Sequence, residues 1–501
     1  GQLPLWNPYI YSGHPFLADI QSAVFYPLSL LTMLLTAVTG FSYRALEIEA
    51  IGHIFLAALF TYLLARRWTR SRAGGLAAAI AFAFSGFLTS YPSLQLAILE
   101  TYVWLPLILL LLDVAGERLE TSSGAPWAAL RWAVAAGLAL GVALLAGHPQ
   151  SALLVAYGSL AFGLFRFWPR AAEAPSRRDD SGASPRSERG LKSWRWPLVL
   201  LAVFGLVGTA LAAIQLLPSW ELVRLSTRAT LSFDEAGSGF TPYDLLQPLF
   251  PALGGNVPAL YFGVLPLGLA ILALITVRRD PAEPPSARRS IAFLGWAVLL
   301  AILISFGKHG AAYSIPYLLA PGWRLFRGQE RAAVWAVLAV ALLSGYGMAW
   351  LSRRWAVMRS EATGEPLGET PQVPPRRRAE GPDGVLALAY AVGAACSLLL
   401  ALVFFVGYQS GHDNLWGFTS AAMTMALFLL VSFLAIRSRQ PALVLAVLVL
   451  DLFTYHPRLH AVAAGRVDLT PYRSLLEAPL QDSSSFRIVN EDVLPENSGL
   501  L

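Results

Sequence analysis

Long apolar runs dominate this sequence, and they decide which folds are open to it. A helix needs about 20 consecutive, mostly apolar residues to cross a bilayer. About twelve segments meet this requirement, at approximately 46–65, 73–91, 95–113, 128–147, 150–168, 197–217, 258–277, 290–306, 331–351, 384–407, 416–436 and 441–456. We therefore expect an all-α, polytopic membrane protein with about twelve transmembrane helices.

Composition points to the same class. Hydrophobic residues make up 56% of the chain and charged residues 14%, whereas a soluble domain carries about 25% charged residues. The net charge of +6 arises from arginines in short loops between apolar runs, so it does not indicate a nucleic-acid partner. The single cysteine, Cys396, excludes an intramolecular disulfide framework and a cysteine metal cluster.

The arginine-rich loops fall on alternate connections, at 66–72, 169–196, 278–289, 352–383 and 437–440. Alternation places the weakly charged loop 114–127 on the same side, which the positive-inside rule makes cytoplasmic. The opening segment and the tail then lie outside. An outer start without a signal segment implies an earlier span, so we expect a fragment that lacks both ends of the complete protein.

Three parts follow from this topology: an outer aromatic loop with a short helix at 1–43, a transmembrane domain at 44–456, and the truncated start of an outer soluble segment at 457–501. The opening loop is rich in aromatic residues, which suit a membrane–water interface, and in prolines, which restrict the residues before them to extended geometry. It reads as an ordered loop on the membrane, or alternatively as a linker that covers helix ends. Its polar candidates for substrate contact are Asn7, His14, Asp19 and Gln21.

Three carboxylates are candidate catalytic groups. Asp19, the one charged residue of the opening loop, can act as a general base or can cap a helix that begins near Ile20. Glu100 lies in the outer third of its span, where a charge is costly. It either lines an outward cavity or is a neutralised structural residue. Glu221 lies in the outer loop 218–257 and is the third candidate.

Positive-inside bias predicts few arginines in outer loops, so the outer arginines are the least expected charges in the chain. Arg324, Arg327 and Arg331 surround a predicted helix start together with Glu330. Guanidinium forks and a helix N-terminus both suit phosphate, so we expect a lipid-phosphate site. Headgroup anchoring or pairing with Glu330 is the alternative. Arg228 is a candidate for a second cationic contact.

The turn at 147–150 joins two apolar helices, so its polar groups must face a cavity or the surface. We expect His148 and Gln150 to line a site, with simple turn chemistry as the alternative. The chain lacks the sequence motifs of nucleotide-binding loops, zinc proteases and serine hydrolases. Nucleotide-driven transport and serine hydrolysis therefore have no support.

Several motifs together resemble the bacterial YfhO-like membrane proteins, which look like part of the GT-C glycosyltransferase superfamily. They are Leu3-Pro-Leu-Trp-Asn-Pro-Tyr9, Gly13-His-Pro-Phe-Leu-Ala18, Gln21-Ser-Ala-Val-Phe-Tyr-Pro27, Gly147-His-Pro-Gln150, Pro218-Ser-Trp-Glu221 with Ser226 and Arg228, and Phe326-Arg-Gly-Gln-Glu-Arg331. The resemblance implies a GT-C-like fold in the bacterial inner membrane. It also implies transfer of a sugar from a polyprenyl-phosphate carrier to a cell-envelope acceptor on the outer face.

The resemblance also bears on the site. The superfamily carries an acidic catalytic residue in its first outer loop, for which Asp19 is the candidate here. A divalent metal assists in some members, and the sequence identifies no metal ligands. A transporter or flippase of lipid-linked saccharides is the alternative function, and a non-catalytic assembly partner is a third. Inverted repeats would favour the transporter, and we find no convincing internal repeat.

Overall fold

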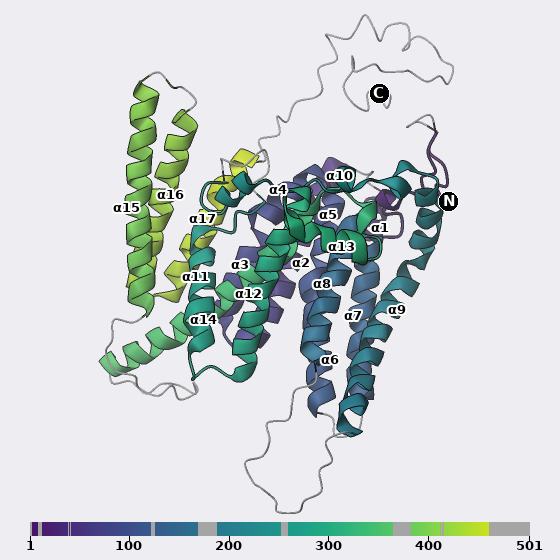
Figure 1. The fold of residues 1–501 in the computed structure, drawn as a ribbon, viewed down its shortest axis with the longest axis horizontal. Helices are drawn as coiled ribbons and strands as arrows, with labels where there is room; N and C mark the ends of the chain where they lie inside the picture. Colours follow the sequence, from purple (N-terminus) through teal and green to yellow (C-terminus); the bar gives the residue numbers. More distant parts are fainter. Residues whose placement is uncertain are drawn as a thin grey trace, which may run out of the picture.

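The computed structural model describes residues 3–8, 13–38, 40, 42–121, 126–168, 188–251, 259–363, 382–410, 412 and 415–459. In these ranges the regular elements are helices, and strand pairing amounts to one antiparallel bridge between Asn7 and His14 (Figure 1). The all-α prediction is confirmed for this part of the chain. Most of the predicted loops 169–196 and 352–383, and of the outer segment 457–501, lies outside the described residues.

Eight helical stretches are long and apolar enough to cross a membrane. They are α2 (Tyr43–Thr69), α5 with α6 (Leu96–Tyr102 and Trp104–Thr121), α7 (Trp127–Leu145), α9 (Glu188–Arg224), α12 (Pro285–Ser305), α14 (Ala333–Thr363), α15 (Pro382–Gln409) and α16 (Leu415–Ser438). The other predicted spans contain α3 (Arg72–Ala83), α8 (Pro149–Phe167), α11 (Val264–Ile275) and α17 (Pro441–Leu459). All twelve predicted segments thus contain helix, and the polytopic prediction is confirmed.

The predicted span 73–91 is wrong as one continuous helix. α3 ends at Ala83, and α4 (Gly86–Leu94) begins after a break at Ser85, whose hydroxyl accepts a hydrogen bond from the amide of Leu88. The freed amide of Gly86 donates to the carbonyl of Tyr261 at 2.9 Å. Backbone groups in a membrane protein need such partners wherever a helix is interrupted. The break divides the predicted span 73–91 into two helices, α3 and α4.

α14 forms the centre of the bundle, since 94% of its most apolar 18-residue stretch is buried. α3, α11 and α12 pack around it (Figure 1). Where α3 crosses α14, Gly74 and Gly345 bring the two backbones together. A Cβ placed on Gly345 would lie 2.8 Å from the carbonyl oxygen of Gly74. Small residues allow such close approach, which supplies the packing that holds helices together in lipid.

The two ends of the bundle differ in structure. The short helices α1 (Pro27–Leu35), α4, α5, α10 (Phe233–Ala236) and α13 (Ser314–Leu319) gather at one end, at the top of the central bundle in Figure 1. We call this the short-helix end. The opposite, arginine-bearing end holds Arg67 in the last turn of α2 and Arg166 in the last turn of α8. Both guanidiniums donate to the carboxylate of Asp113 in α6 at 2.7 Å.

Candidate functional site

The opening loop is ordered by its own backbone. Asn7 and His14 exchange two amide–carbonyl hydrogen bonds of 2.8 Å. Gly13 has a φ of +108°, and a Cβ there would lie 2.4 Å from the ring of Trp6. Glycine is therefore required at the point where the indole covers the chain. The ring of Trp6 is itself 58% exposed, as an interfacial aromatic residue would be.

His14 and Asp19 form a pair within this loop. The imidazole Nε2 lies 3.0 Å from Oδ2 of the carboxylate, and both side chains are partly buried. The other oxygen of Asp19 accepts a 2.9 Å hydrogen bond from the amide of Gln21, at the start of the short helix η1 (Ile20–Ser22). The predicted cap at Asp19 is confirmed. The same geometry leaves one carboxylate oxygen paired with an imidazole.

The loop packs against the turn between α7 and α8. A Cβ at Gly147 would lie 3.3 Å from the carbonyl oxygen of Ile20 and 3.4 Å from that of Gln21. The side chain of Gln215 in α9 donates to the carbonyl of Leu17 at 2.8 Å. The opening loop and the turn at 147–150 are therefore neighbours, although the sequence separates them by more than a hundred residues.

Four residues of distant sequence gather around that turn, and we call them the His148 cluster: His148, Gln150, Arg228 and Arg331. Arg331 donates to the side-chain oxygen of Gln150 at 2.5 Å, and the amide group of Gln150 donates to the carbonyl of Gly328 at 2.9 Å. Direct contacts thus join predicted residues from two separate loops, and exposed Arg228, from a third loop, acts on His148 through its charge.

His148 is buried and neutral. Its Nδ1 accepts a 3.1 Å hydrogen bond from the amide of Ser151 at the start of α8. Burial, and then the charges of Arg331 and Arg228, lower the pKa of His148 to about 3. A neutral imidazole whose Nδ1 is an acceptor carries its proton on Nε2. His148 can therefore donate one hydrogen bond from Nε2.

The segment from Arg324 to Arg331 is fixed to the connection between α9 and α11. The amide of Gly328 donates to the hydroxyl of Ser238 at 2.9 Å, and buried Gln329 donates to the carbonyl of Ala236 at 2.8 Å. Glu330 is half-buried beside Gly328. Gln329 is a structural residue that the sequence analysis passed over.

The remaining predicted residues lie at the periphery. Arg324 and Arg327 are exposed, and the charge of Arg327 contributes, after hydrogen bonds from Ser232, to lowering the pKa of Glu235. Glu221 is exposed near the end of α9, and the contacts described above do not join it to the His148 cluster. Nothing in the geometry tests these three predictions.

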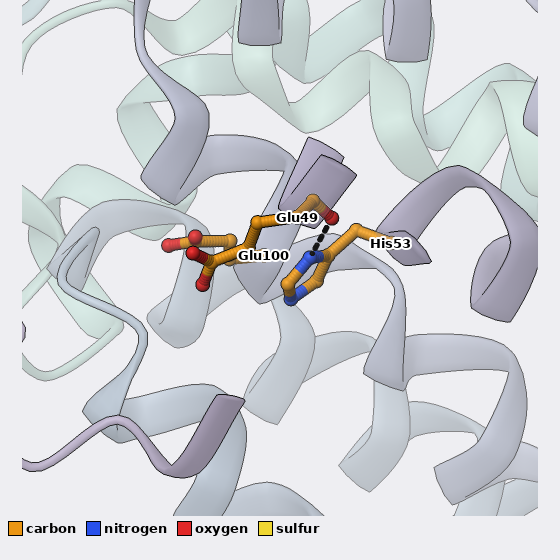
Figure 2. A group of neighbouring side chains, drawn as sticks. All are labelled: Glu49, His53 and Glu100. Carbon is orange, nitrogen blue, oxygen red and sulfur yellow. Dashed lines mark hydrogen bonds between the residues drawn. The ribbon is translucent and has the colours of Figure 1, made fainter. Parts of the chain in front are cut away.

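Glu100 points into a second buried group, which we call the carboxylate–histidine triad: Glu49, His53 and Glu100. Glu49 and His53 lie one turn apart on α2, and Glu100 comes from α5 (Figure 2). One ligand atom from each lies within 4.8 Å of the others, and the exposed fractions are 7%, 2% and 4%. The sequence analysis named Glu100 and missed its partners. The available signal was a Glu and a His four residues apart in an apolar helix, which share one helix face.

The triad and the His148 cluster are connected through α5. Glu100 occupies the triad, and two residues further on the hydroxyl of Tyr102 donates to the carbonyl of Arg331 at 3.3 Å. On the triad side, the hydroxyl of Tyr26 donates to His53 Nε2 at 2.6 Å. Tyr26 precedes α1 and is fully buried. Its burial raises its pKa, so the phenol stays protonated.

Comparisons with known proteins are sparse. No protein-family model and no curated protein matches the chain. One solved structure that resembles it is the crystal structure of ArnT from Cupriavidus metallidurans bound to undecaprenyl phosphate. It has 15% sequence identity and a TM-score of 0.44 over 88% of this chain and 70% of the ArnT chain. A likeness of this degree transfers neither ligand nor site residues, so the YfhO-like and GT-C resemblance of the motifs stays a prediction.

Proposed function

We propose that this chain is a membrane glycosyltransferase. It would transfer a sugar from a polyprenyl-phosphate carrier to a cell-envelope acceptor on the outer face of the bacterial cell membrane. One observation carries the proposal: the loop with the His14–Asp19 pair touches the turn with the His148 cluster at Gly147. A candidate base and candidate phosphate ligands therefore share one end of the bundle. The motif resemblance of the opening loop supports the same reaction class.

The proposed reaction is displacement at the anomeric carbon. The acceptor hydroxyl attacks that carbon while the carboxylate of Asp19 takes its proton, as a general base. The bond from the anomeric carbon to the phosphate oxygen breaks, and the polyprenyl phosphate leaves with the electron pair. Asp19 then releases the proton to water. His14, 3.0 Å from the carboxylate, orients Asp19 for this role.

The His148 cluster would act on the leaving group. Arg331 and Arg228 supply positive charge where the phosphate gains negative charge, and guanidinium forks match phosphate oxygens. His148, which is neutral, adds a hydrogen-bond donor through Nε2. Burial keeps the imidazole neutral over the physiological pH range, and the amide of Ser151 fixes its tautomer. These residues would bind the carrier and stabilise the transition state.

Asp19→Asn tests the proposed base. The amide keeps the size and capping ability of the carboxylate, because Asn and Asp are near-equal caps. It cannot accept the proton, so transfer should fall about a hundredfold or more. The assay measures transfer of radiolabelled hexose from polyprenyl phosphate to cell-envelope acceptor by the intact protein in detergent.

Glu117→Gln is the matched control, since it makes the same chemical change on an exposed residue at the arginine-bearing end. It should transfer at the wild-type rate. If Asp19→Asn also does so, Asp19 is a cap and the base lies elsewhere. A transporter or flippase would give no transfer in detergent, even as wild type, because detergent leaves no second compartment. Absence of transfer by the wild type would therefore overturn the enzyme proposal.

A further inference from the structure

The carboxylate–histidine triad poses an electrostatic problem that the proposed reaction does not solve. Glu49 and Glu100 face each other inside the bundle, almost without solvent (Figure 2). Among the described residues, the side chains outside the triad that hydrogen-bond to Glu49 and His53 are neutral: the hydroxyl of Ser29 donates to Glu49 at 2.7 Å, and the phenol of Tyr26 donates to His53. Two buried carboxylates cannot both remain charged without a compensating cation. Either protons or a metal ion must neutralise them.

The arrangement of His53 favours a metal ion. Its Nδ1 donates to the backbone carbonyl of Glu49 at 2.7 Å, which fixes the tautomer and leaves a lone pair on Nε2. Metal-ligating histidines characteristically bond their other nitrogen in this way. Two ligands on one tetrahedral zinc ion lie about 3.4 Å apart, because each bond is about 2.1 Å long. The ligand atoms of the triad lie within 4.8 Å of one another, so side-chain rotations that draw them together would form the site.

We propose that Glu49, His53 and Glu100 bind one divalent transition-metal ion, with zinc as the best match. Mixed imidazole and carboxylate ligands suit zinc, and three protein ligands leave a fourth position open. Two carboxylates cancel the charge of the ion, so the loaded site is neutral. Its ligands come from α2 and α5, so a bound ion would hold these two helices together inside the bundle. The inference does not depend on the reaction that the chain catalyses.

Tyr26 gives the site a distinctive property. Its hydroxyl donates to Nε2 of His53 at 2.6 Å, on the same lone pair that an ion would use. The indole of Trp104 donates to the Tyr26 oxygen at 3.3 Å, which holds the phenol in that position. The metal ion and the phenol therefore compete for one nitrogen. Removing the hydroxyl should strengthen metal binding, whereas removing the imidazole should abolish it.

The test measures metal content and cobalt binding of the intact protein in detergent. Wild type should carry about one zinc per chain, and after chelation it should bind Co²⁺ with visible bands of low coordination number that zinc then erases. His53→Gln should weaken Co²⁺ binding at least about a hundredfold, since even residues that only support a ligand contribute ten- to hundredfold. Tyr26→Phe should bind Co²⁺ more tightly than wild type.

His148→Gln is the matched control, because His148 is a buried histidine outside the triad. It should keep wild-type Co²⁺ affinity. The wild-type and Tyr26→Phe measurements keep the test decisive if His53→Gln fails to fold. The proposal is overturned if wild type binds neither zinc, manganese nor cobalt at equilibrium, in which case protons neutralise the carboxylates. It is also overturned if His53→Gln binds Co²⁺ normally, or if Tyr26→Phe loses binding.

Discussion

His148 shows how a single residue in the turn between α7 and α8 responds to its surroundings. Its pKa is lowered from about 6.5 in an unfolded chain to about 3 in the folded protein. Between these values the unfolded chain binds a proton that the folded protein does not, so stability falls as pH decreases. Acidification from about pH 7.5 to about pH 5 should lower the free energy of unfolding by roughly 2 kcal/mol through this residue.

The check is the thermal unfolding midpoint across that pH range. His148→Gln removes the titrating group, so the variant should lose less stability on acidification than wild type. His412→Gln, at an exposed histidine, should follow the wild-type curve. If the unfolding midpoints of wild type and His148→Gln fall equally on acidification, His148 is not the origin of the pH dependence.

Arg331 is the guanidinium that the structure most firmly places in the His148 cluster. Arg331→Gln removes a charge-assisted contact, which should raise the KM for the polyprenyl-phosphate donor roughly ten- to hundredfold. Arg331→Lys should restore little, because it supplies a point charge without the fork. Arg118→Gln, exposed at the arginine-bearing end, is the control with expected wild-type kinetics. A wild-type KM for Arg331→Gln would remove the residue from the donor site.

At the scale of elements, Asp113 connects three helices at the arginine-bearing end. Its two oxygens each accept from a different guanidinium, Arg67 of α2 and Arg166 of α8. Its side chain is 14% exposed. Removing one partner of a buried ion network costs about 3–5 kcal/mol, because the remaining charges lose their compensation. Asp113→Asn should therefore lower the unfolding midpoint by several degrees.

Glu117→Gln provides the comparison for this network. Glu117 also pairs with Arg67, at 2.5 Å, but its side chain is 49% exposed. Exposed pairs contribute about 0–1 kcal/mol, so this variant should unfold close to the wild-type midpoint. Equal losses for both variants would show that burial does not decide the strength of the network.

Helix boundaries illustrate what the apolar runs can and cannot predict. Every predicted span contains helix, because a long apolar run in lipid must satisfy its backbone polar groups within the segment. The break at Ser85 was not predicted, since Phe84-Ser85-Gly86 reads as part of a continuous run. What stabilises the break is the carbonyl of Tyr261, which lies far along the chain. The residues around Ser85 do not indicate such a distant partner.

At the scale of the whole molecule, the sequence likewise predicts which residues belong to the candidate site but not how they come together. The members of the His148 cluster could be singled out because polar groups in a short turn between apolar helices, and arginines in outer loops, are unexpected in such a chain. Their convergence depends on how α8, α9 and α14 pack, which the sequence does not encode locally. In the triad, part of the arrangement was visible in the sequence but its significance was not. The four-residue spacing of Glu49 and His53 was visible, but its meaning depends on Glu100, which α5 supplies across the bundle.

Orientation in the membrane is the property on which the outer-face proposal depends. The short-helix end and the arginine-bearing end are separated by helices such as α12, whose 21 residues span about 30 Å. Its C-terminal Ser305 accepts from the amide of Phe240 at the short-helix end, so its first turn lies at the other end. Positive-inside bias then predicts that the short-helix end faces outward.

Single cysteines at the two ends test this orientation in a Cys396→Ala background. Ala229→Cys, at an exposed position in η2 (Thr227–Thr230) beside Arg228, should react with an impermeant maleimide in intact cells. Ser286→Cys, exposed in the first turn of α12, should react only after the membrane is opened. Both changes are small and leave the helices intact, so reactivity reports side rather than unfolding. The reverse labelling pattern would place the His14–Asp19 pair and the His148 cluster in the cytoplasm, where an outer-face transfer reaction could not use them.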